Sequence, residues 1–137
     1  VTDWFASDFT LEEIRQLRAV QPRAERDQQF NGQFVIPTFE EVIALAKGAA
    51  RTVGLYPEIK HSTFHAALFG AHHIEDSVLA ILHAHYDNSA DAPVFIQSFE
   101  VANLRYLHTR TEIRLIQLIA GHALRADGSV GLGTPLD

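Results

Sequence analysis

A carboxylate and an ammonium group lie two residues apart in the segment Gly54-Leu55-Tyr56-Pro57-Glu58-Ile59-Lys60. The segment is short, rich in β-formers and bounded by a glycine, which predicts a strand over 53–60. Because side chains alternate along a strand, Glu58 and Lys60 share one face. At the carboxyl end of a strand, where parallel α/β folds hold their active sites, Glu58 can hold a hard divalent cation while Lys60 neutralises a phosphate bound to that cation. A simple Glu–Lys ion pair is the alternative, since Glu-x-Lys is a common triplet.

Histidines are the other side chains suited to catalysis or metal binding. The eight are His61, His65, His72, His73, His83, His85, His108 and His122. His61 follows Lys60 directly and is therefore the histidine best placed to contact a substrate at that strand end. The spacing of His61 and His65 is that of a pair on one helical face, but no H-E-x-x-H motif is present. We interpret the others as surface or loop imidazoles.

Two capping boxes predict where helices begin. In Thr10-Leu11-Glu12-Glu13 and in Thr38-Phe39-Glu40-Glu41, a glutamate follows a threonine by three residues. The first box predicts a helix over 11–18, and the second predicts a helix from 39 to about 52. The polar, aperiodic stretch 21–35 between them is typical of a surface loop.

The rest of the chain alternates between helical and extended patterns. We expect a loop over 61–70, helices over 71–86 and 100–109, strands over 93–99 and 113–119, and a loop or frayed tail over 121–137. Three apolar strands separated by helices predict a parallel sheet covered by crossover helices. Pro57 cannot donate to a ladder and belongs at an edge, an end or a bulge. A closed barrel of this kind needs about 250 residues, so the chain is either a small open α/β sheet or an internal piece of a barrel.

The run VGLYPEIKHSTFH resembles the third-strand motif of the glycerophosphodiester phosphodiesterases. DFTLEEIRQLRA and IPTFEEVIALAK precede it, and VFIQSFEVANLRYL and IRLIQLIA follow it, in the family's order, so the resemblance covers roughly residues 8–120. It implies an α/β fold that is part of a (β/α)8 TIM barrel, with residues 1–137 forming a single partial domain from the middle of that barrel. The implied activity is that of a hydrolase of lipid and glycerol metabolism, which cleaves glycerophosphodiesters to glycerol 3-phosphate and an alcohol with a divalent cation, calcium or magnesium.

The resemblance also implies roles for single residues. Glu58 falls on the family's metal-ligand glutamate, and Lys60 falls on the catalytic lysine that faces the phosphate. Gln97 and Phe99 fall on the fourth-strand end that lines the substrate pocket, where His61 is a further candidate for substrate binding. The family's His-Arg pair, its acidic pair of metal ligands and its second catalytic histidine have no match here. We expect them before Val1, with the last barrel strands after Asp137, and we expect the chain alone to be inactive.

Composition limits the partners. With 11 Lys+Arg, 17 Asp+Glu and a net charge of −6, the chain lacks the basic balance of a nucleic-acid-binding protein. It has no cysteine for a thiolate site or nucleophile and no apolar run of the length that crosses a membrane. The absence of methionine indicates a processed, trimmed or partial chain. The expected partners are a small-molecule glycerophosphodiester and, through open sheet edges, a second copy in a homo-oligomer.

Two other interpretations stay open. A non-catalytic α/β binding or assembly module would keep the family's sequence without its chemistry. The other is a small histidine-rich metal-binding protein, although only His61 and His65 have a spacing typical of metal ligands. The resemblance favours a periplasmic or secreted location, which the composition does not address.

Overall fold

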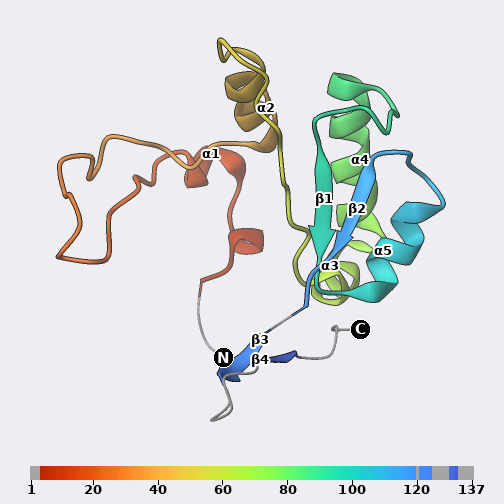
Figure 1. Ribbon diagram of the computed structural model, residues 1–137. Coiled ribbons are helices and arrows are strands. Elements are labelled where there is room, and N and C mark those ends of the chain that lie inside the picture. Colours follow the sequence, from red (N-terminus) through yellow and green to blue (C-terminus); the bar gives the residue numbers. More distant parts are fainter. Residues whose placement is uncertain (1–3, 120, 125–129, 133–137) are drawn as a thin grey trace. The chain divides into compact units, whose positions relative to one another are not determined.

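The computed structural model describes residues 4–119, 121–124 and 130–132. Contacts divide the chain into two compact units, residues 1–42 and 43–137, and the boundary falls within the helix over 39–47 (Figure 1). The first unit contains two short helical turns and a long connection. The second unit contains the parallel strands and the helices that alternate with them.

The first unit begins with the 3₁₀ turn η1 (Ala6–Asp8) and the helix α1 (Leu11–Ile14). The predicted capping box of α1 is present, because the Glu13 amide donates to Thr10 Oγ1 (3.3 Å) and the Thr10 amide donates to Glu13 Oε2 (2.8 Å). The predicted extent of 11–18 is wrong, since the helix ends at Ile14. Leu11 and Leu17 remain 52% and 53% exposed, so packing contributes little to a longer helix.

Helix α2 (Phe39–Lys47) also begins at its predicted capping box. The Thr38 amide donates to Glu41 Oε2 (2.8 Å), and the Glu41 amide donates to Thr38 Oγ1 (3.3 Å). The helix is shorter than the predicted span to about residue 52. Gly48 follows its last residue, and glycine is among the poorest helix formers.

Strands β1 (Phe95–Ser98) and β2 (Arg114–Gln117) form a parallel pair in the second unit (Figure 1). The segment 53–60 also pairs with β1 in parallel. Its two bridges join Leu55 to Val94 and Glu58 to Gln97. Three parallel strands therefore follow one another in chain order with helices between them, as predicted.

Pro57 interrupts the first of these strands, which the pattern predicted to be continuous over 53–60. The Leu55 amide donates to the Pro93 carbonyl (2.8 Å), and the Ile59 amide donates to the Gln97 carbonyl (3.0 Å). The position between them is Pro57, which has no N–H to donate. The strand is consequently reduced to two isolated bridges, which is the cost that a proline imposes on a ladder.

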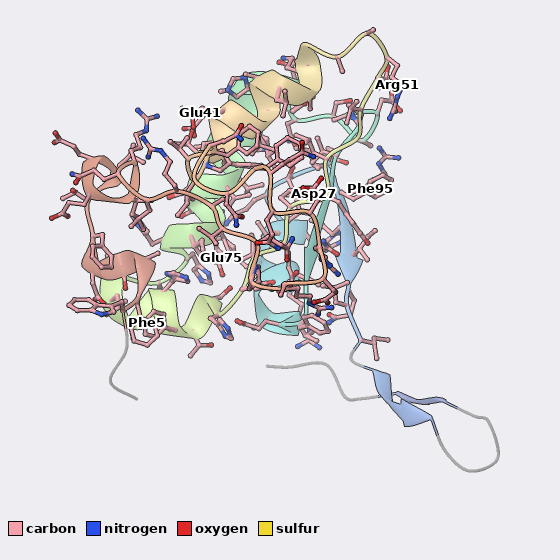
Figure 2. The ribbon with its side chains drawn as sticks, turned by 90° about the vertical axis from the view of Figure 1, so that its left-hand side faces the viewer. Phe5, Asp27, Glu41, Arg51, Glu75 and Phe95 are labelled. Carbon is pink, nitrogen blue, oxygen red and sulfur yellow. The ribbon has the colours of Figure 1, made fainter. Side chains whose placement is uncertain are left out.

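Helices α4 (His73–Tyr86) and α5 (Val101–His108) confirm the predicted crossover helices. They cover one face of the sheet, where the buried core lies. Its fully buried apolar side chains include Leu82, Val94, Ile96 and Leu107. The other face carries Tyr56, Glu58, Lys60, Phe95 and Gln97 by alternation. Figure 2 shows Phe95 and Glu75, a residue of α4, on opposite sides of the sheet.

Two predicted loops are wrong. Residues 61–70 contain the helix α3 (Ser62–Phe69), and the expected tail contains the antiparallel pair β3 (Gly121–Leu124) and β4 (Val130–Leu132). Strands this short lie below the length at which alternation can be recognised. Among the described residues, no helix is long and apolar enough to cross a membrane.

Candidate active site

The carboxyl ends of segment 53–60 and of β1 surround a pocket of about 200 Å³. Its lining residues are Glu58, Ile59, Lys60, His61, Ser98, Phe99 and Glu100. Four of the five residues singled out from the sequence therefore line one pocket, at the end of the strands where parallel α/β folds hold their active sites.

Glu58 and Lys60 form the charged wall of this pocket. Lys60 Nζ lies 3.7 Å from Glu58 Oε2, an ionic contact longer than a hydrogen bond. The Lys60 side chain is 65% exposed, whereas that of Glu58 is only 23% exposed. Glu58 Oε1 is buried and has no hydrogen-bond partner among the described residues. A buried carboxylate oxygen without a partner is costly, and a cation is the ligand that compensates for it.

His61 lines the pocket and has a left-handed backbone conformation (φ 55°, ψ 45°) immediately before α3. Few residues other than glycine adopt this region, and such backbone strain concentrates at functional sites. Because His61 lies outside the helix, it does not share a helical face with His65, whose ring stacks on Phe69 (6.3 Å between centroids).

Gln97 lies next to Glu58 in the sheet but does not line the pocket. Its Nε2 donates to the Tyr56 carbonyl (3.0 Å), which holds the amide against the neighbouring segment 53–60. Phe99 contributes the apolar side of the pocket. The structure thus brings Glu58, Lys60, His61 and Phe99 together and places Gln97 beside them.

A buried polar cluster beneath the pocket was missed by the sequence patterns. Asn103 Nδ2 donates to Ser62 Oγ (2.7 Å) and to Ser98 Oγ (3.0 Å), and the Ser62 amide donates to Glu100 Oε1 (3.0 Å). The sequence offered one weak indication of this cluster. Asn103 adjoins Leu104 on the buried face of α5, where a polar side chain needs hydrogen-bond partners.

Within the part of the chain that the structure describes, no three His, Cys, Asp or Glu side chains are grouped as a metal site. Glu58 is accordingly a single candidate ligand. A hard cation takes about six oxygen ligands, so its remaining ligands must come from water, substrate or residues other than these.

Comparisons with known proteins identify the family to which the sequence is related. The model of the Glycerophosphoryl diester phosphodiesterase family matches residues 2–132. The glycerophosphodiester phosphodiesterase GDPD6 of Arabidopsis thaliana is 38% identical over 129 residues, which are 87% of this chain and 35% of that protein. The glycerophosphodiester phosphodiesterase of Haemophilus influenzae is 30% identical over 139 residues, covering 85% of this chain and 37% of that protein. The chain spans a little over a third of the length of these curated relatives.

The family's fold is the TIM barrel, and the successive parallel strands with their crossover helices correspond to part of one. The pocket at the carboxyl ends of the strands lies where a barrel of this kind holds its active site. With the family model matching nearly the whole length, the chain belongs to the glycerophosphoryl diester phosphodiesterase family.

Proposed function

We propose that this chain is the middle portion of a metal-dependent phosphodiesterase that hydrolyses glycerophosphodiesters to glycerol 3-phosphate and an alcohol. The two relatives, both glycerophosphodiester phosphodiesterases, support the reaction class. The observation that carries the proposal is the buried Glu58 Oε1, which has no hydrogen-bond partner in the described part of the chain and lies in one pocket with the Lys60 ammonium. The Glu58 carboxylate can bind a divalent cation, and the Lys60 ammonium can bind the phosphate. Metal-dependent hydrolysis of a phosphodiester uses both kinds of group.

Glu58 fits the divalent cation on which the family generally depends, because its Oε1 is buried and none of the described residues bonds to it. We propose Glu58 as one carboxylate ligand of a Ca²⁺ or Mg²⁺ ion. When bound, such a cation polarises the phosphoryl oxygens and stabilises charge that develops on them. Its remaining ligands would be water, substrate or other residues of the enzyme.

Lys60 is proposed to bind the phosphate directly. Its ammonium group is a compact point charge with three donors, which suits a phosphoryl oxygen. Its contact with Glu58 Oε2 is 3.7 Å and mostly solvated, so it costs little to exchange for a phosphate. Lys60 thereby orients the substrate and neutralises charge in the transition state.

The neighbouring side chains are proposed to complete the substrate site. His61 reaches the mouth of the pocket, where its imidazole can donate to a substrate oxygen. Phe99 offers an apolar wall to the carbon chain of the glycerol or alcohol. Gln97 is proposed as a further polar contact, although its amide must first leave the Tyr56 carbonyl.

The test is an assay of the full-length enzyme that carries this segment, with glycerophosphocholine as substrate and glycerol 3-phosphate as the measured product. The proposal expects turnover that stops on addition of a chelator and returns with Ca²⁺ or Mg²⁺. Turnover that is unaffected by the chelator would contradict metal dependence, and no turnover of any glycerophosphodiester would contradict the reaction.

A further inference from the structure

We propose that Asn103, a buried residue of α5, is a positioning residue that holds the Lys60–His61 pair at the pocket. The inference rests on the function proposed above and assigns a role to a residue that touches neither substrate nor cation. Its basis is a set of hydrogen bonds that fix the backbone on both sides of this pair.

The first anchor lies just before Lys60. Ser98 Oγ donates to the Ile59 carbonyl (2.9 Å) and accepts from the Glu100 amide (3.1 Å). It also accepts from Asn103 Nδ2 (3.0 Å). A hydroxyl has one donor and two acceptor positions, so all the capacity of Ser98 is used. Its hydrogen can consequently point only toward the Ile59 carbonyl.

The second anchor lies just after His61. Ser62 Oγ accepts from Asn103 Nδ2 (2.7 Å), and the Ser62 amide donates to Glu100 Oε1 (3.0 Å). Lys60 and His61 therefore form a two-residue span that is fixed at Ile59 and at Ser62. His61 keeps its left-handed conformation inside this span, and strained backbone of this kind persists only where the surroundings hold it.

The Asn103 amide bridges the two serine hydroxyls directly, beside Glu100, whose amide donates to Ser98 Oγ and whose carboxylate accepts from the Ser62 amide. Asn103 is only 2% exposed, and both hydrogens of its amide are used, one on each serine. Its removal would leave two hydroxyl groups short of a donor in a buried place. The expected consequence is a shift of the Lys60–His61 span, and a misplacement of about 1 Å can lower turnover about 100-fold.

Thr111 offers a matched control at the opposite end of the strands. It is also buried, and its Oγ1 donates to Asn88 Oδ1 (2.8 Å) and accepts from the Ile113 amide (3.1 Å). This cluster precedes β2, on the side of a barrel that supports stability rather than catalysis. Loss of Thr111 should therefore lower the melting temperature without moving the pocket.

The experiment compares Asn103→Leu and Thr111→Val in the full-length enzyme, with kcat, KM and melting temperature measured for each. We expect Asn103→Leu to lower kcat about 10- to 100-fold with KM little changed, because a transition-state contact is weakened. Thr111→Val should keep kcat near that of the parent. An equal effect of the two variants on kcat, or none for Asn103→Leu, would overturn the proposal.

A double-mutant cycle with Lys60→Met tests whether Asn103 acts through Lys60. If it does, Asn103→Leu should cost much less in the Lys60→Met background, whereas independent effects would multiply and refute the proposal. If Asn103→Leu does not fold, Ser62→Ala takes its place in the cycle, because this variant removes one hydroxyl of the same cluster. Failure of the proposed function is separately visible, because the unsubstituted enzyme would then show no chelator-sensitive turnover of glycerophosphocholine, and failure of the Lys60 role alone would leave kcat unchanged in Lys60→Met.

Discussion

Glu58 lies directly beside Gln97 in the sheet. The Ile59 amide donates to the Gln97 carbonyl (3.0 Å), and the Gln97 amide donates to the Pro57 carbonyl (2.9 Å), so the two residues are paired. Paired residues of parallel strands project their side chains on the same side. Here that side is opposite to the helices, and in a barrel it is the interior. The pairing therefore places the Glu58 side chain on the face that is the interior in a barrel, near the strand end where barrel enzymes hold their active sites.

The ligand role of Glu58 can be tested by Glu58→Gln in the full-length enzyme. The amide keeps the shape of the side chain but removes the negative charge that a hard cation requires. We expect metal affinity and kcat to fall together, with affinity measured by calorimetric titration of Ca²⁺ or Mg²⁺.

Glu12→Gln provides the control for this experiment. Glu12 is an exposed residue in the first turn of α1. Its substitution should leave both metal binding and turnover intact. Unchanged metal binding by Glu58→Gln would show that the ligand assignment is wrong.

The pKa of Tyr106 provides a test that does not depend on catalysis. Tyr106 Oη donates to Asp76 Oδ1 (2.7 Å), and this hydrogen bond raises the pKa of the tyrosine above its usual range, with desolvation adding to the shift. We expect Asp76→Ala to lower this pKa, measured by ultraviolet titration of tyrosinate absorbance. The pKa of Tyr86, which is raised by burial, should not change.

The same shift predicts how stability depends on pH. The unfolded chain loses the Tyr106 proton near its usual pKa of about 10, whereas the folded chain holds it to higher pH. The stabilisation is therefore complete below about pH 10 and is lost as the pH rises through the folded-state pKa. The free energy of unfolding, measured with urea from about pH 9 to 11, should fall less steeply with pH in Asp76→Ala than in the parent. An equal fall in both proteins would contradict the assignment.

The isolated 137-residue chain is expected to have no appreciable phosphodiesterase activity. By the family resemblance it supplies one candidate metal ligand, Glu58, and the candidate phosphate-binding Lys60, and it has no match for the His-Arg pair, the acidic pair or the second catalytic histidine. Loss of a positioned acid–base group typically costs about 100- to 10,000-fold in rate. Chelator-sensitive hydrolysis of glycerophosphocholine by the pure chain would contradict this expectation.

Local features of the fold were predictable from the sequence. Both capping boxes were found because each places its two partners within four consecutive residues, as in Thr38 and Glu41. The parallel strands were found because Val94 and Ile96 belong to an apolar run between helical patterns. Alternation then placed Glu58 and Lys60 on one face, and the pocket brings them together.

Features that depend on distant contacts were not predictable. Helix α3 begins where the Ser62 amide meets the Glu100 carboxylate, 38 residues away in the sequence. The pattern of residues 61–70 gives no sign of that partner, so a loop was expected. Asn103 was missed for the same reason, since its role depends on Ser62 and Ser98, which the fold brings to it.

The measurement that tests the central claim most directly is the turnover of Lys60→Met in the full-length enzyme. Methionine keeps much of the length and apolar character of the stem while removing the charge. If Lys60 faces the phosphate, it contributes about 3–4 kcal/mol of transition-state stabilisation, so turnover should fall about 100-fold or more with the melting temperature nearly unchanged. If Lys60 only pairs with Glu58, the exposed pair contributes about 0–1 kcal/mol to stability. Near-normal turnover of Lys60→Met would then contradict the account.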